Sequence, residues 1–480
     1  MTGSANKPSI LVDGSLLLGG DQTGIASFTR SLASGLHAMG ASVNLLLSSR
    51  AHPIRGAPAI ALADQVFSAT RIPRGRRAQL AAQVARLVET RLGFRRKLSA
   101  LPVSLDGVEL AALQPRLPPF HAVYNASNFL AHSRAVFAMR ACFTELRVDQ
   151  PIDAVHWTVP APVLIRGKPS IYTIHDVIPL KFPQFSLDVA GRAAVLHGEI
   201  ARMADHIMTV SERSREDIRS ILGVPEERIS VVYQPVPPMA SVGRVEAERL
   251  VSNLYGAAPG EYVFFCGAIE PKKNLLRLIE AFSAADIGQQ LLIAGPLGWL
   301  YDDVQDLLSR VAASGVRYLG YLPRRHIAAL MECACFFVFP SIYEGFGIPP
   351  LEAMQLGTPV LTSHGGSLPE VVGDAAITVD PLDVDAIAAA IRQLAGDADL
   401  RRELARRGMA RARRFSPQAF AAQLSLAYRK IGISIAPPET ETALCNANSA
   451  SAPSCARSAS TPPPGAIPAP SRTPTSTSPT

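Results

Sequence analysis

Short runs of apolar, often β-branched residues alternate along the chain with longer segments whose apolar residues recur at helical spacing. Strands of a parallel sheet covered by helices on both faces are buried on both sides, so they form continuous apolar runs. The pattern therefore predicts parallel strands joined by helices. The predicted strands form two series, 10–12, 43–47, 122–124, 170–174, 206–210 and 229–233, then 262–266, 290–294, 316–319, 335–339, 359–362 and 376–379.

Two such series predict an α/β protein with two doubly wound, Rossmann-like domains. The chain has 480 residues, enough for two or three domains. The last part, 436–480, is rich in Pro, Ser, Thr and Ala, which predicts a disordered tail because it offers little apolar surface to bury. The other expected parts are an N-terminal domain over 1–238, a linker over 239–260, a C-terminal domain over 261–417 and a final helix over 418–435 that packs back on the N-terminal domain.

The net charge of +7 suits anionic small molecules or an anionic membrane surface. No RNA- or DNA-binding module motif is visible, so nucleic acid is not an expected partner. No apolar stretch approaches the ~18 residues of a spanning helix. The six cysteines are scattered without a CxxC pair, as in proteins of a reducing cytoplasm. We therefore expect a cytoplasmic protein whose membrane contact, if any, is peripheral.

The segment Phe336 to Gly357 has the strongest chemical pattern in the chain. A buried strand leads into a loop with Glu344, and Pro349-Pro350 then opens a helix that carries Glu352. A helix N-terminus presents free N–H groups and a positive dipole end, which favour a phosphate. The pattern fits a diphosphate at the helix start with two carboxylates that accept hydrogen bonds from sugar hydroxyls. The alternative is a capped helix with acidic residues that favour its dipole.

This segment, Glu344-Gly-Phe-Gly-Ile-Pro-Pro-Leu-Glu352, resembles the E-x7-E signature of glycosyltransferase family 4. The resemblance implies retaining enzymes with the GT-B fold, in which two Rossmann-like domains face each other across a cleft. The chain is similar especially to bacterial mannosyltransferase-like members that build surface polysaccharides. The likeness continues through Pro271-Lys-Lys-Asn274, Gly295-Pro-Leu-Gly-Trp299, Gly320-Tyr-Leu-Pro323, Gly357-Thr-Pro-Val360, Leu368-Pro-Glu-Val371 and Gly373-Asp-Ala-Ala376.

The resemblance also implies roles for single residues. Glu344 would contact hydroxyls of the donor hexose, Glu352 would bind the ribose hydroxyls, and Lys273 would neutralise the diphosphate leaving group. Tyr321 and Leu322 would border the nucleobase. The backbone of the signature would hold the sugar and phosphates through Phe346, Gly347 and Ile348, with Leu351 at the phosphate-binding turn.

One position departs from the family pattern. Many members carry Arg directly after the glycine that ends the first C-domain strand, whereas Gly267 is followed here by Ala268. Lys272 is a candidate replacement for that second phosphate-binding cation. The alternative is that Lys272 is a solvated turn residue.

Three N-terminal segments complete the expected site. In the glycine-rich segment 19–25, the resemblance implies that Gly24 approaches the donor's β-phosphate, although an ordinary flexible turn is the alternative. His175 and Asp176 follow a strand, at the edge where α/β sheets bind ligands. The resemblance places His175 against the donor sugar, and the alternative is a structural histidine. Ser211 belongs to a third matching segment, but it is also a good helix N-cap.

Two arginine-rich segments have no place in that site. Residues 70–98 combine many basic side chains with apolar residues, which suits a basic amphipathic helix on anionic lipid or a surface helix with one solvated face. Residues 401–414 are interpreted as a solvated charged face of the C-terminal domain.

The sequence contains no clear nucleophile with an adjacent base and no carboxylate pair placed as in a hydrolase. With the retention that the family resemblance implies, we therefore expect front-face displacement, in which the departing diphosphate helps to deprotonate the acceptor hydroxyl. No cofactor or metal is expected. The two DxD triplets, Asp383-Val-Asp385 and Asp397-Ala-Asp399, fall at predicted helix edges where Asp is a common cap.

The function expected from these features is transfer of a hexose, with mannose from GDP-mannose as the first candidate, onto a growing surface polysaccharide. The oligosaccharide acceptor is expected to be linked to a polyprenyl diphosphate. The alternatives are a UDP-hexose or deoxysugar donor, a GT-B nucleotide-sugar epimerase, and a degenerate sugar-binding protein. No pattern identifies the acceptor, the linkage or the oligomeric state.

Overall fold

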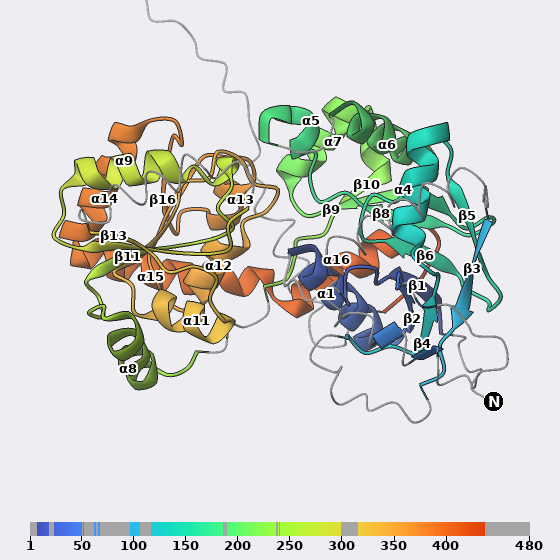
Figure 1. Cartoon of the computed structure of the whole chain (residues 1–480), viewed down its shortest axis with the longest axis horizontal. Helices are drawn as coiled ribbons and strands as arrows, with labels where there is room; N and C mark the ends of the chain where they lie inside the picture. Colours follow the sequence, from blue (N-terminus) through green and yellow to red (C-terminus); the bar gives the residue numbers. More distant parts are fainter. Residues whose placement is uncertain are drawn as a thin grey trace, which may run out of the picture. The chain divides into compact units, whose positions relative to one another are not determined.

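The computed structural model describes residues 7–18, 24–49, 51, 62–63, 66–67, 97–105, 117–185, 190–236, 239, 241–298 and 315–436. The expected tail after 436, residues 19–23 and most of the basic segment 70–98 lie outside the described residues. Two β-sheets organise the described chain, and helices cover both (Figure 1).

The C-terminal sheet is parallel throughout, with the strand order β13-β12-β11-β14-β15-β16. Numbered from its first strand, that order is 3-2-1-4-5-6, the Rossmann order predicted from the second strand series. The strands span Tyr262–Cys266 (β11), Gln290–Ala294 (β12), Val316–Tyr318 (β13), Phe336–Phe339 (β14), Val360–Ser363 (β15) and Ile377–Val379 (β16).

Helices pack in pairs on the two faces of this sheet, α9 with α14 and α8 with α11 (Figure 1). Their apolar stripes face the sheet, whose β11 and β14 phenylalanines are fully buried. The bounds are Arg244–Tyr255 (α8), Leu275–Ala285 (α9), Arg324–Glu332 (α11), Ile348–Gln355 (α12), Leu368–Val372 (α13), Val384–Gly396 (α14), Ala398–Ala412 (α15) and Pro417–Arg429 (α16), with 3-10 turns at Pro271–Lys273 (η4) and Arg413–Phe415 (η6).

The N-terminal sheet has the order β10-β9-β8-β6-β1-β2-β4-β3-β5-β7 in the part of the chain that is described. Its strands are Ser9–Asp13 (β1), Ser42–Leu47 (β2), Lys97–Pro102 (β3), Ala122–Asn125 (β4), Thr144–Val148 (β5), Ala154–Trp157 (β6), Val163–Leu164 (β7), Ser170–Thr173 (β8), His206–Thr209 (β9) and Ile229–Val231 (β10). Its helices are Gly24–Ala38 (α1), Phe129–Arg140 (α4), Ile178–Lys181 (α5), Ala190–Met203 (α6) and Glu212–Leu222 (α7), with 3-10 turns at Pro183–Phe185 (η2) and Glu226–Arg228 (η3).

The expectation of purely parallel strands is wrong at β3, which pairs antiparallel with β4. The sequence pattern also missed β3, β5, β6 and β7. β3 is half exposed, so it lacks a continuous apolar run, and it begins at Lys97, inside the segment considered as a basic helix. β6 is a four-residue strand with a buried histidine in its middle, and no apolar-run criterion finds such a strand.

That histidine, His156, helps to fix the last helix. Its Nδ1 lies 2.8 Å from the Tyr428 hydroxyl of α16, and its Nε2 lies 2.7 Å from the Thr173 hydroxyl of β8. Burial lowers the pKa of His156 to about 3, so the ring is neutral. Phe420 of α16 also packs edge-on against Phe28 of α1, at 6.0 Å between ring centroids. The final helix therefore packs against α1 and the N-terminal sheet.

The two DxD triplets cap helices, as predicted. Asp383 accepts a hydrogen bond from the Ala386 N–H at 2.9 Å, and Asp397 accepts one from the Leu400 N–H at 2.8 Å.

The interpretation of 401–414 as a solvated charged face is only partly right. Arg402, Arg406 and Arg407 form exposed ion pairs, but Arg401 and Arg411 donate to backbone carbonyls of α14 and α13 and are therefore not fully solvated.

Candidate functional site

The strand order of the C-terminal sheet reverses between β11 and β14, and ligands bind doubly wound sheets outside the strand ends at such a point. The loops that follow these two strands carry Lys272 and Lys273 on one side and Glu344 on the other. Asn274 joins the loops, because its Nδ2 donates to the carbonyls of Pro340, at 3.0 Å, and Pro381, at 2.5 Å. This tie holds both lysines beside Glu344.

Glu344 is buried between the two lysines. Its Oε1 lies 2.5 Å from Lys273 Nζ, and its Oε2 lies 3.7 Å from Lys272 Nζ. Burial works to raise the pKa of Glu344, but the two lysines and hydrogen bonds outweigh it and hold the pKa below its ordinary value. The carboxylate is therefore ionised at neutral pH.

Lys272 faces the site, so the structure decides against a solvated turn residue. The carboxylate of Glu344, with Glu270 at 3.4 Å, raises the pKa of Lys272 above its usual value despite burial. Lys273 stands over the ring of Phe339, with Nζ 4.8 Å from the ring centroid. Two partly buried ammonium groups thus lie beside Glu344.

The loop after β14 leads directly into α12. Gly347 is the N-cap of α12, with φ of 121°, and a Cβ there would lie 2.8 Å from Leu368. Only glycine fits that position, and a glycine offers no side chain to the first N–H groups of the helix. Those groups are therefore available to an anion.

The other signature residues divide between backbone and side-chain roles. Phe346 and Leu351 are buried, and the Phe346 ring packs 5.6 Å from that of Phe415. Their side chains belong to the core, which leaves the backbone for ligand contact. Gly24 is the first residue of α1, and a Cβ on it would lie 3.5 Å from the side chain of Ile348, the first residue of α12. The N-termini of α1 and α12 therefore lie close together.

Glu352 is also buried, on the first turns of α12, and its Oε1 lies 2.7 Å from Arg324 Nη2. Burial raises the pKa of Glu352, and Arg324 opposes that shift. Arg324 was not predicted, because no local pattern joins it to a residue 28 positions later. Burial lowers the pKa of Arg30 on α1, and the charge of Arg324 lowers it further.

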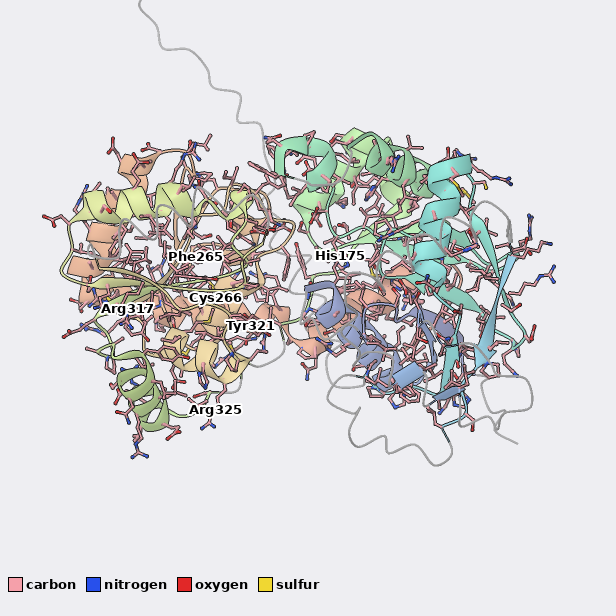
Figure 2. All side chains as sticks on the ribbon, viewed as in Figure 1. His175, Phe265, Cys266, Arg317, Tyr321 and Arg325 are labelled. Atoms are coloured by element: carbon pink, nitrogen blue, oxygen red, sulfur yellow. The ribbon has the colours of Figure 1, made fainter. Side chains whose placement is uncertain are left out.

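The suggested nucleobase neighbours lie close to this pair. Tyr321 is 67 % exposed and Leu322 is buried, on the loop that follows β13. Figure 2 labels Tyr321 and Cys266, the last residue of β11, in the C-terminal part of the protein. Burial, with the charge of Glu352, raises the pKa of Cys266 to about 12, so this thiol is inert.

His175 follows β8, and Figure 2 labels it in the N-terminal part. Its Nε2 lies 3.2 Å from the Thr158 carbonyl, and its ring meets that of Phe28 edge-on at 4.8 Å. Burial lowers the pKa of His175, although Asp176 opposes the shift. A carbonyl can only accept, so Nε2 carries the proton of the neutral ring and Nδ1 is left as an acceptor.

Ser211 is the N-cap of α7, as its residue type indicated. It caps α7, since its Oγ accepts from the Ser214 N–H at 3.0 Å, and it donates to the carbonyl of Gly345 at 2.8 Å. Sequence reasoning assigned no role to Tyr343, which precedes Glu344, or to its partners. Among the described residues no group of three His, Cys, Asp or Glu side chains could hold a metal ion. None of the described helices is both long and apolar enough to span a bilayer.

Comparison with known proteins agrees with this geometry. Residues 256–411 match the family model of glycosyl transferases group 1, and residues 103–239 match that of glycosyltransferase family 4. The solved structures share the fold. The sucrose-phosphate synthase of Thermosynechococcus elongatus has a TM-score of 0.57 at 19 % identity, over 89 % of this chain and 99 % of that one. HepE of Anabaena, in complex with UDP and glucose, has a TM-score of 0.55 at 19 % identity, over 89 % of this chain and 100 % of that one.

Curated relatives are more similar in sequence. The O-antigen chain mannosyltransferase B of Escherichia coli is 37 % identical over 268 residues, which cover 54 % of this chain and 70 % of that protein. The serotype-specific mannosyltransferase WbdA of Escherichia coli is 28 % identical over 284 residues, which cover 56 % of this chain but 33 % of WbdA. With these matches and the two Rossmann-like sheets, the chain belongs to glycosyltransferase family 4 and has the GT-B fold.

Proposed function

We propose that this glycosyltransferase moves mannose from GDP-mannose, with retention of configuration, onto a growing surface polysaccharide. One observation carries the proposal: Glu344 is buried between Lys272 and Lys273 beside the open N-terminus of α12. The names of the similar mannosyltransferases support the choice of mannose.

The donor would be held at its diphosphate, its sugar and its ribose. The α12 N–H groups, at the positive end of the helix dipole, and the two lysine ammonium groups suit the diphosphate. Glu344 would accept hydrogen bonds from mannose hydroxyls. Glu352, already oriented by Arg324, would accept those of the ribose. The Nδ1 atom of His175 would accept one further hydrogen bond from a sugar hydroxyl.

The transfer step needs no protein nucleophile. The bond between the mannose C1 and the diphosphate oxygen breaks, and the acceptor oxygen forms its bond to C1 on the same face. The acceptor proton passes to the departing diphosphate. The chain supplies position and electrostatic stabilisation, chiefly from Lys272 and Lys273, as negative charge grows on the leaving group. Neither a metal nor a cofactor takes part in this scheme.

The acceptor is proposed to be an oligosaccharide on a polyprenyl diphosphate, met at the cytoplasmic face of a membrane. A groove of about 770 Å³ between α4 and α6 supports such contact. Exposed Met139 and Val195 stand there with Arg134, Arg140 and Arg192, and no Asp or Glu is found among its described lining residues. Apolar and cationic side chains together suit anionic lipid.

Vesicle co-sedimentation tests that contact. The double variant Arg134→Glu, Arg192→Glu should bind anionic vesicles at least about tenfold more weakly than the wild type, since each arginine near such a surface contributes about 1 kcal/mol. Arg249→Glu, on α8, is the matched control. Equal binding by all three proteins, or no preference for anionic over zwitterionic vesicles, contradicts the proposed contact.

A panel of nucleotide sugars tests the main proposal. The purified chain is assayed with GDP-mannose, UDP-hexoses and deoxysugar donors, both by thermal shift and by transfer to a mannose-terminated oligosaccharide. GDP-mannose alone should stabilise the protein and be consumed, with or without EDTA. Transfer from a UDP-hexose only, release of an epimer without acceptor, or loss of turnover in EDTA would each contradict it.

A further inference from the structure

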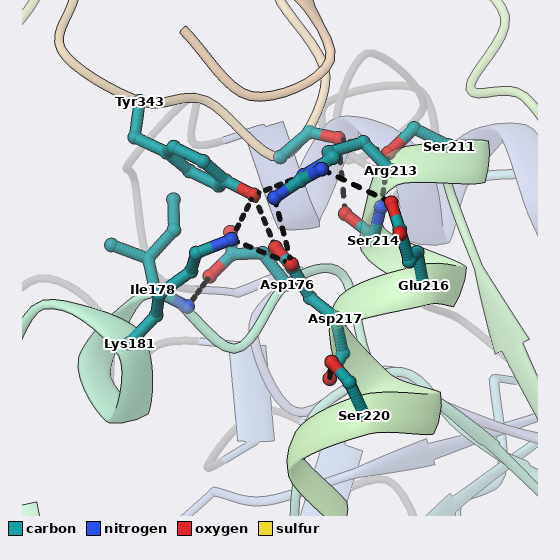
Figure 3. A network of polar contacts seen from close by, with 11 residues as sticks. Asp176, Ile178, Lys181, Ser211, Arg213, Ser214, Glu216, Asp217, Ser220 and Tyr343 are labelled. Atoms are coloured by element: carbon teal, nitrogen blue, oxygen red, sulfur yellow. Dashed lines mark hydrogen bonds and ion pairs between the residues drawn. The ribbon is translucent and has the colours of Figure 1, made fainter. Parts of the chain in front are cut away.

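Tyr343 directly precedes Glu344, and its side chain is held by the N-terminal part of the protein (Figure 3). The hydroxyl donates to the Asp217 carboxylate of α7. It accepts from Lys181 Nζ of α5 at 3.0 Å and from Arg213 Nε of α7 at 2.8 Å. A phenol has one proton and two lone pairs, so these three partners use its full hydrogen-bonding capacity.

The partners of Tyr343 also bind one another. Lys181 Nζ lies 2.7 Å from Asp217 Oδ1, and Arg213 Nη2 lies 3.5 Å from the same oxygen. Lys181 Nζ stands 4.6 Å from the centroid of the Tyr343 ring, and the Phe182 ring packs at 5.0 Å. Tyr343 and Asp217 are buried, so the network has little freedom to rearrange.

Gly345, on the other side of Glu344, is fixed from the same direction. Its carbonyl accepts from Ser211 Oγ at 2.8 Å and from Ser214 Oγ at 3.3 Å. A Cβ on Gly345 would lie 2.8 Å from Asp176 Oδ2, so the backbone closely approaches that side chain. Both neighbours of Glu344 are therefore hydrogen-bonded to α7 or its N-cap.

A third tie joins the same two regions. Glu370 of α13 accepts from the backbone N–H groups of Glu212, at 2.7 Å, and Arg213, at 3.2 Å, in the first turn of α7. A carboxylate is favoured there by the helix dipole. Because this tie does not involve Tyr343, the contact between the regions does not depend on the phenol hydroxyl alone.

We propose that Tyr343 is a positioning residue, whose hydrogen-bonded hydroxyl fixes the backbone of Tyr343 to Gly345 so that Glu344 points at the donor sugar. The inference rests on the proposed function. It assigns the N-terminal residues Lys181, Arg213 and Asp217 a role in aiming a carboxylate of the C-terminal site. Their hydrogen bonds and ion pairs in the described structure join Tyr343, Asp217 and neighbouring residues of α7 and α13 rather than Glu352, so the nucleotide should bind without them.

Tyr343→Phe removes the hydroxyl and keeps the ring. We expect kcat for mannose transfer to fall by about 10- to 100-fold, the scale of a small misplacement of a catalytic group. GDP affinity should stay within about threefold, since this variant leaves the nucleotide anchors intact. Tyr255→Phe is the matched control, because the Tyr255 hydroxyl also forms a partly buried hydrogen bond, to His326 at 2.6 Å. That bond lies outside the signature loop.

Asp217→Asn gives a second, independent variant, which weakens the same hydroxyl contact and should reproduce the selective loss of kcat. If Tyr343→Phe loses only thermal stability, as Tyr255→Phe would, or raises KM at unchanged kcat, the positioning role is wrong. A wild-type protein that transfers no sugar contradicts the proposed function itself, and the inference falls with it. An active wild type with fully active Tyr343→Phe and Asp217→Asn variants contradicts the inference alone.

Discussion

Lys273 and Glu344 form a buried ion pair, with Nζ 2.5 Å from Oε1, between the loops that follow β11 and β14. The family resemblance assigns one residue to the diphosphate and the other to the sugar. Their contact, together with that of Lys272, lowers the pKa of Glu344 against the effect of burial and keeps the carboxylate ionised.

Replacing Lys273 with Ala should reduce kcat by about 10²- to 10³-fold, the usual effect of removing one preorganised electrostatic group. The protein should still fold, because Lys272 keeps Glu344 paired. Steady-state transfer kinetics and a thermal melt provide the two measurements, with exposed Lys7→Ala as the control. Unchanged turnover would remove Lys273 from the mechanism.

Replacing Arg324 with Ala should weaken GDP binding by about tenfold, because Glu352 loses the partner that orients it and opposes its protonation. The neighbouring Arg325→Ala is a matched control, since Arg325 pairs with Glu246 at 3.1 Å on the surface (Figure 2). Isothermal calorimetry with GDP compares the two variants. Equal affinities would show that the Arg324–Glu352 pair has no part in ribose binding.

Replacing Gly345 with Ala should abolish most activity, because the new methyl group would meet Asp176, whose Oδ1 already accepts from the Ile178 N–H at 3.0 Å. Gly198→Ala, in α6 with open space around it, should be neutral or stabilising by up to about 1 kcal/mol. Transfer rates and melting temperatures of both variants check this contrast. Normal rates in Gly345→Ala would indicate that the loop can move away from Asp176 at no cost.

Acid should destabilise the protein through His156, whose pKa is lowered from 6.5 to about 3 by burial. The unfolded chain binds this proton more tightly, so the stabilisation is present above pH 6.5 and is lost as the pH falls toward 3. One such group changes the unfolding free energy by about 1.4 kcal/mol per pH unit. Urea unfolding of the wild type and of His156→Gln between pH 6.5 and 4 measures this change in the unfolding free energy. Equal pH dependence of the unfolding free energy in the two proteins would contradict a role for His156.

The C-terminal fold was predictable because β11, β12 and β14 are largely continuous apolar runs and the start of α12 is marked by glycine and proline. β3 and β6 were not, since one is half exposed and the other carries a buried histidine whose partners come from distant elements. Glu344, Glu352 and Lys273 were found from a local signature. Arg324 and Tyr343 were missed because their roles depend on contacts with Glu352 and Asp217 that no sequence spacing encodes.

The most direct test is the anomeric configuration of the product formed from GDP-α-mannose, read by NMR, with the wild type and Glu344→Gln compared. The account predicts an α-mannosidic product from the wild type. It also predicts a rate lower by about 10²- to 10³-fold in the variant, with GDP affinity unchanged within about threefold. A β-linked product, or an equally fast Glu344→Gln protein, would contradict the central claim that Glu344 serves a retaining transfer.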